Sequence, residues 1–211
     1  MKKTLFLFLV LGFIVACSSQ RTVTSRIVTL QYLSQPQEGV TINGVRWATA
    51  NVAAPGTFAQ NPEDTGMFYQ WNRRVALSAG CNEDWDSSEP EGTMWYTEND
   101  PCPEGWRLPT NEELTALTNT HHTQAILNGV KGILFSAGDN QIFLPITGRR
   151  SRVLMNTPLV DVGVMATYWS STQSRNWPHR NAYRMHIHNG RPTMGQALKF
   201  NDFSLRCVAI N

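Results

Sequence analysis

The sequence changes from loop-forming to helix-forming residues within one stretch, residues 99–114. The first part of this stretch holds three prolines, a glycine and a cysteine, which is typical of a loop. Thr110 and Glu113 then make a capping box, which predicts a helix that begins at Asn111 and ends by His121. This boundary fixes where a loop must give way to a helix.

Most of the remaining chain has the pattern of short strands. Asn43-Gly44 lies between alternating apolar residues and predicts a β-hairpin. Residues 182–188 alternate between apolar and polar side chains, and Asn189-Gly190 follows as a second turn. Further strands are expected at residues 141–146, 167–171 and 203–210. Many short strands, one helix and long loops together predict the α+β class.

The N-terminus has the features of an export signal. Lys2 and Lys3 precede an apolar run that ends at Val15, shorter than the roughly 20 residues that span a bilayer. Residues 14–17 resemble a bacterial lipobox, which implies that Cys17 carries lipid and holds the protein on a membrane. We therefore expect a signal peptide (residues 1–16), a lipidated tether (17–36) and one domain (37–211).

The lipobox resemblance implies a bacterial envelope lipoprotein. Ser18 follows the lipidated cysteine, which favours the outer membrane over the inner membrane. No acidic run follows the anchor, since the first acidic residue is Glu38. The sequence leaves open whether the domain faces the periplasm or the cell surface.

The charges balance overall but are unevenly distributed. Without the leader the chain has 16 basic and 16 acidic residues, which argues against a nucleic-acid binder. Residues 61–113 hold twelve acidic and three basic residues, whereas residues 149–211 hold nine basic and two acidic residues. Either two parts of one fold attract each other, or the basic part presents a ligand-binding face.

Three cysteines follow the lipidated one: Cys81, Cys102 and Cys207. An exported compartment permits a disulfide. Cys102 and Cys207 lie at the two ends of the main domain, and a bridge between them would close a loop of about a hundred residues. We expect this pair and a free Cys81; a Cys81–Cys102 bridge is the alternative.

Four sequence blocks resemble a known family. They are GMFYQWN at residues 66–72, the stretch 99–114, YWSS at 168–171 and SLRCV at 204–208. In this order they are similar to the Fibrobacter succinogenes major paralogous domain, a family found in Bacteroidetes lipoproteins. RLPTNEEL and the terminal LRCV also resemble the formylglycine-generating-enzyme branch of the C-type lectin fold. The resemblance implies a C-type-lectin-like domain with short antiparallel strands, one or two helices and long loops.

The sequence gives no sign of catalysis. It lacks the Gly-x-Ser-x-Gly, phosphate-loop and His-Glu-x-x-His motifs. The related enzyme uses two closely spaced cysteines near its end, where this chain has only Cys207. We therefore expect no enzyme, no cofactor and no metal. Two weaker hypotheses are calcium at Glu83, Asp84 and Asp86, and zinc at His179, His186 and His188.

A tryptophan in a polar loop marks the expected binding region. Trp177 lies between Arg175 and Arg180, and an exposed tryptophan among cations suits sugar stacking or a protein anchor. The alternative is that its ring folds back onto the core. The sequence predicts a ligand site within the region from Tyr168 to Lys199. Its candidate residues are Arg175, Asn176, Trp177, His179, Arg180, Arg184, His186, His188 and Arg191.

These features together predict an envelope-anchored, non-enzymatic module that binds a glycan or a protein, with the membrane as its other partner and no nucleic acid. A sharper hypothesis is a receptor diversified by a retroelement, since such receptors also use the lectin-like fold and vary a stretch before the last strand. The alternative is a structural or fimbrial component of the envelope that self-associates through edge strands. An enzyme would need a pocket around the histidines.

Overall fold

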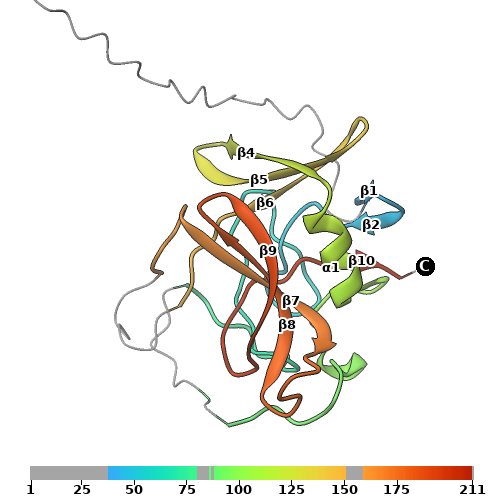
Figure 1. Ribbon diagram of the computed structural model, residues 1–211, viewed down its shortest axis with the longest axis vertical. Coiled ribbons are helices and arrows are strands. Elements are labelled where there is room, and N and C mark those ends of the chain that lie inside the picture. The colour runs from blue at the N-terminus through green and yellow to red at the C-terminus, as the bar shows by residue number, and fades with distance from the viewer. Residues whose placement is uncertain (1–37, 80–85, 87, 151–158, 211) are drawn as a thin grey trace, which may run out of the picture.

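The computed structural model describes residues 38–79, 86, 88–150 and 159–210. This part of the chain is mainly β, with one short α-helix and three small antiparallel sheets (Figure 1). The expected short strands and long loops are confirmed, but strands outweigh helix more than the α+β class implies. Cys17, Cys81, Glu83 and Asp84 lie outside the described residues.

Each sheet is assembled from neighbouring antiparallel strands. The first sheet has the order β1-β2-β10-β3, with strands Val40–Ile42, Val45–Trp47, Val208–Ala209 and Trp106–Arg107. The second is β4-β5-β6, with strands His121–Leu127, Val130–Ala137 and Asn140–Pro145. The third is β7-β8-β9, with strands Met165–Gln173, Asn181–His188 and Arg191–Leu198.

Three hairpins turn on an Asn-Gly pair. At each pair both residues have positive φ, which is the backbone geometry of a two-residue type I′ turn. The two hairpins expected from the sequence, β1–β2 and β8–β9, are confirmed. The β4–β5 hairpin carries the same signal and was missed. The three turns are Asn43-Gly44, Asn128-Gly129 and Asn189-Gly190.

The helix α1, Asn111–Thr118, begins where the capping box places it. The Thr110 hydroxyl accepts a hydrogen bond from the Glu113 amide, and the Glu113 carboxylate accepts one from the Thr110 amide. Arg107 adds a two-pronged ion pair with the same carboxylate. A single turn of 3-10 helix, η1 (Thr97–Asn99), precedes it. No helix among the described residues has the length and apolar character to cross a bilayer.

The core consists of aromatic and aliphatic side chains from all three sheets and α1. Trp71, Trp106 and Trp169, which lie in three of the four sequence blocks, are buried. The expectation of one strand over residues 203–210 was wrong, since only Val208–Ala209 forms a strand. The preceding residues make isolated bridges instead, because this segment passes between sheets and pairs with a different neighbour at each step.

Candidate functional site

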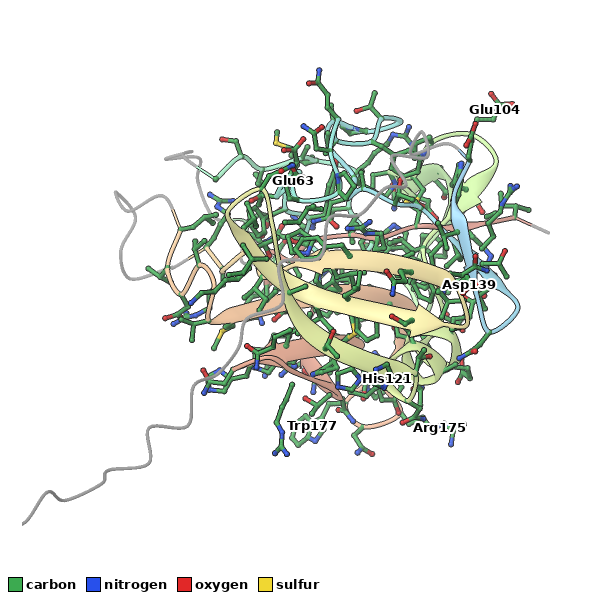
Figure 2. All side chains as sticks on the ribbon, turned by 90° about the horizontal axis from the view of Figure 1, so that it is seen from above. Glu63, Glu104, His121, Asp139, Arg175 and Trp177 are labelled. Carbon is green, nitrogen blue, oxygen red and sulfur yellow. A yellow bond between two sulfur atoms is a disulfide. The ribbon has the colours of Figure 1, made fainter. Side chains whose placement is uncertain are left out.

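The loop between β7 and β8, residues 174–180, presents an exposed aromatic side chain and is named here the Trp177 loop. Trp177 is 72% exposed, so the alternative in which its ring folds onto the core is excluded. Its φ is +57°, a left-handed conformation that is rare for a bulky residue. Figure 2 shows Trp177 and Arg175 at the periphery of the molecule, away from the sheets.

Hydrogen bonds hold the Trp177 loop in one conformation. The carbonyl of Trp177 accepts from the amides of Arg180 and Asn181, both at 2.9 Å. The Ser174 hydroxyl accepts from the Asn176 amide and donates to the Asn176 carbonyl. A strained backbone that persists under such constraints is a known feature of binding and catalytic sites.

One of the cations beside Trp177 is paired with a carboxylate. Arg180 forms an ion pair with Glu89, with a nitrogen–oxygen distance of 2.7 Å. Hydrogen bonds at the start of α1, with a smaller contribution from the charge of Arg175, lower the pKa of Glu112. The loop therefore combines an exposed ring with polar groups, and Arg180 is paired with a carboxylate.

The structure divides the candidate ligand residues into two groups. Five of them lie in the Trp177 loop, at one end of β8. His188 and Arg191 lie at the opposite end, where they pair across the β8–β9 turn. Because β8 has eight residues, these ends are about 23 Å apart. The nine residues therefore do not form one compact site.

Arg184 and His186 lie between the two groups, on one face of β8. Arg184 is opposite Gly195 of β9, whose missing side chain leaves the guanidinium partly uncovered. The Thr167 hydroxyl lies 3.2 Å from Nδ1 of His186, and the His186 and His188 rings stack with centroids 6.0 Å apart. Arg184 makes no ion pair with any residue that the structure describes.

The described residues form no cluster of metal ligands for either the zinc or the calcium hypothesis. His179 lies in the Trp177 loop, whereas His186 and His188 lie further along β8. No group of three or more histidine, cysteine, aspartate or glutamate residues within the described ranges could hold a metal ion. Of the calcium candidates, Asp86 is described, and its carboxylate forms an ion pair with Arg73.

The C-terminal part of the chain exposes less positive charge than its composition indicates, because several of its basic side chains are buried or paired. Of the nine basic residues between 149 and 211, two are buried, three form ion pairs and Arg152 lies outside the described residues. The other three are Arg175, Arg184 and Arg191. The Arg180–Glu89 pair joins the acidic and basic parts, so attraction within the fold accounts for some of the asymmetry.

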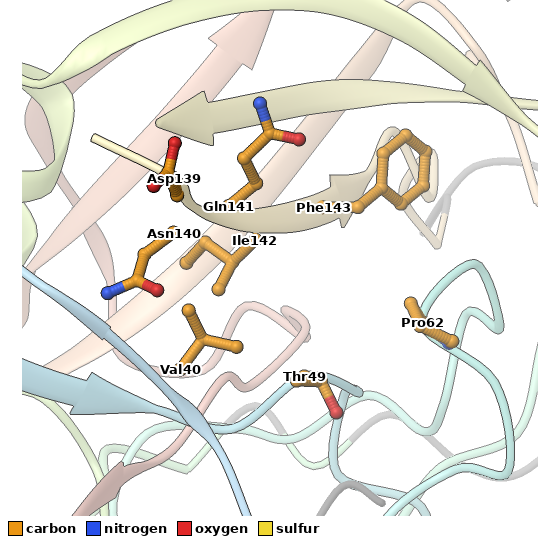
Figure 3. Close-up of a pocket in the computed structure, with 8 residues that line it drawn as sticks. All are labelled: Val40, Thr49, Pro62, Asp139, Asn140, Gln141, Ile142 and Phe143. Atoms are coloured by element: carbon orange, nitrogen blue, oxygen red, sulfur yellow. The ribbon is translucent and has the colours of Figure 1, made fainter. Parts of the chain in front are cut away.

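A small cavity of about 170 Å³ is lined by residues of β1 and β6 (Figure 3). Its lining residues on β6 are consecutive, so the cavity meets the edge of this strand rather than one face of the sheet. Asp139 is its single carboxylate, and its lining has no histidine, cysteine or serine. The cavity therefore offers no acid–base pair for catalysis.

Acidification should destabilise the fold through His186. Burial, followed by the charges of Arg184 and His188, lowers the pKa of His186 below 6.5. The unfolded chain then binds this proton more readily, so stability falls as pH drops through about 6.5 towards the lower folded-state pKa. We expect the melting temperature to fall between about pH 7.5 and pH 5, and less so in His186→Gln.

His121, which is exposed on β4, supplies the comparison variant His121→Gln. His186→Gln should reduce the pH dependence of the melting temperature more than His121→Gln does. Equal pH dependence in the wild type and His186→Gln would contradict the assignment to His186.

Comparison of the sequence with known families assigns this disulfide-linked domain of three small sheets to one of them. Residues 41–209, more than three quarters of the chain, match the Lcl C-terminal domain, so the chain belongs to this family. This match names a different family from the one that the four sequence blocks resemble. No curated protein and no solved structure matches the chain.

Proposed function

We propose that this chain is a non-enzymatic binding module, anchored to the bacterial envelope through Cys17, that recognises a glycan through the Trp177 loop. The observation that carries the proposal is an exposed tryptophan in a left-handed conformation on a hydrogen-bonded loop. A left-handed conformation is unfavourable for a bulky residue and brings no benefit to an ordinary surface loop. In a binding site it holds the ring ready to contact a ligand, which lowers the entropy cost of binding.

The chemistry of the loop favours a sugar as its ligand. An exposed indole stacks on the apolar face of a pyranose ring, and nearby Asn176 and His179 can exchange hydrogen bonds with its hydroxyls. Because Arg180 is already paired with Glu89, this arginine does not require an anionic ligand. Arg184, His186 and His188, further along β8, and Arg191, at the start of β9, lie too far from Trp177 to be required for a single ring.

The proposed fold class remains C-type-lectin-like. Two features support it: α1 follows the RLPT segment, and β10 near the C-terminus pairs with β2 near the N-terminus. A further hypothesis is that the chain is a receptor diversified by a retroelement. A template repeat of such an element in the DNA near the gene would support this hypothesis. Placement in the outer membrane rests on the lipobox and Ser18.

The test compares glycan-array binding by the wild type and Trp177→Asn. Asparagine tolerates positive φ, so the substitution should raise the free energy of unfolding by about 0.5–1 kcal/mol while binding falls at least about tenfold. Arg191→Ser, at the other end of β8, is the matched control and should retain binding.

Glycan binding that survives in Trp177→Asn would contradict the proposal. The same conclusion would follow if Trp177→Asn lowered the melting temperature, since the ring would then be structural. A self-associating structural component is the second candidate, favoured by β4 and β9, which are edge strands within the described sheets. Absence of glycan binding together with self-association on sizing would favour it.

A further inference from the structure

A groove of about 570 Å³ runs beside β3 and the disulfide, and is named here the disulfide groove. Trp95, Cys102 and Trp106 contribute to its walls, with Ser171 of β7 and Ile210 at the C-terminal end. Its volume lies in the range of ligand-binding clefts, roughly 300–1,000 Å³. It shares no residue with the Trp177 loop, and Figure 2 places Glu104 of its lining and Trp177 on opposite sides of the molecule.

The walls of the groove are held in place by specific bonds. The Asp100 carboxylate accepts hydrogen bonds from the amides of Cys102 and Leu108, at 2.9 and 3.0 Å. The Trp95 indole donates to the Asn99 carbonyl, and Cys102 is bonded to Cys207. The groove is therefore a preformed concave surface rather than a gap left by loose packing.

One strongly exposed apolar side chain lies at this groove. Ile210, which is 58% exposed, lines it together with the aromatic side chains Trp95 and Trp106. An exposed aliphatic side chain beside a concave, aromatic-walled cleft is suited to contact an apolar side chain of a partner protein.

The charges at the groove have a net negative sign. Arg107 is neutralised by its two-pronged ion pair with Glu113. The groove then has Asp100 and Glu104 in its lining, against the single positive charge of Arg74. A cationic partner would be attracted and an anionic one repelled.

We propose that the disulfide groove binds an extended polypeptide segment of a partner protein, with an aliphatic anchor side chain flanked by lysine or arginine. The anchor enters the cleft between Trp95, Trp106 and Ile210. A flanking cation lies against Glu104. This site is independent of glycan binding by the Trp177 loop.

The test uses fluorescence anisotropy with the purified protein and three short labelled peptides. The first has leucine flanked by lysines, the second has leucine flanked by glutamates, and the third has glycine in place of leucine between lysines. The first peptide should bind at least about tenfold more tightly than either of the others, and its affinity should fall with added salt.

Paired variants locate the binding site. Ile210→Ser should weaken binding of the first peptide about tenfold, whereas Val162→Ser, at a residue with the same 58% exposure outside the groove, should not. Glu104→Lys should weaken it several-fold, and the control Asp139→Lys should have no effect. Both groove residues are exposed, so their variants should fold normally.

Three results would overturn the proposal. They are equal binding of the leucine peptides with lysine and glutamate flanks, equal losses in the groove and control variants, and no binding of any peptide. Trp177→Asn should bind the lysine–leucine peptide normally. Failure of glycan binding would therefore leave this result intact, and the two proposals can fail separately.

Discussion

Arg206→Leu should lower the free energy of unfolding by about 3–5 kcal/mol, which corresponds to a fall of about 10 °C in the melting temperature. Arg206 is fully buried, immediately before the disulfide cysteine Cys207. Its guanidinium donates to the Asn51 side chain at 3.0 Å, to the Ala48 carbonyl at 3.0 Å and to the Phe143 carbonyl at 3.2 Å. Leucine would remove the donor from these three acceptors, all of which belong to buried residues.

The position of Arg206 explains why the loss should be so large. Ala48 directly follows β2, Phe143 belongs to β6, and Tyr168 of β7 lies close enough to influence the pKa of Arg206. One guanidinium thus connects all three sheets. Burial lowers the pKa of Arg206 to about 10, so the group remains charged at neutral pH and keeps all its donors.

Urea unfolding monitored by circular dichroism would measure the effect. Arg191→Leu is the matched control, because Arg191 is exposed and the same substitution there should change stability by less than about 0.5 kcal/mol. Arg206→Lys should be destabilised as well, since an ammonium group cannot reproduce the planar fork. A loss below about 1 kcal/mol in Arg206→Leu would contradict the role assigned to the guanidinium.

Removing the Cys102–Cys207 disulfide should lower stability by about 4–5 kcal/mol and the melting temperature by about 10 °C. The bond is present in the structure, as the sequence predicts, and joins residues 105 positions apart. Such a long closed loop restricts the unfolded chain strongly. The same bond fixes the loop before α1 to the strand β10, so its loss would also loosen the disulfide groove.

The measurement compares melting of the wild type with and without reductant, and of the Cys102→Ala, Cys207→Ala double variant. Reduced wild type and the double variant should melt at similar temperatures. The double variant should not respond to reductant, which controls for effects of the reductant itself. An unchanged wild-type melting temperature, with both thiols shown to be free by mass spectrometry, would contradict the prediction.

Several elements were predictable because their signals are local. The capping box places the start of α1 through bonds between residues three positions apart. The Asn-Gly turns depend on two residues that tolerate positive φ. The same reasoning applied to Asn128-Gly129 would have found the β4–β5 hairpin. His121 and His122, expected at the helix end, instead begin β4.

The candidate site was only partly predictable. The exposure of Trp177 agreed with its polar surroundings in the sequence. The sequence did not show how the nine candidate residues are distributed, because residues along a β-strand are separated by about 3.3 Å each. Charge counts also misled, since Lys199 is buried over the Trp71 ring and Arg206 is buried between sheets. No local pattern distinguishes these cations from exposed ones.

The sequence by itself determined the helix start and two of the hairpins. These features rest on short-range bonds or on turn geometry. The sequence favoured Cys102–Cys207 over Cys81–Cys102, and the structure decided for Cys102–Cys207. The tertiary structure decided which cations are buried, how the candidate residues are divided along β8, and that distant segments form the disulfide groove. Those properties arise from contacts between residues far apart in the chain, and no local pattern of side chains encodes such contacts.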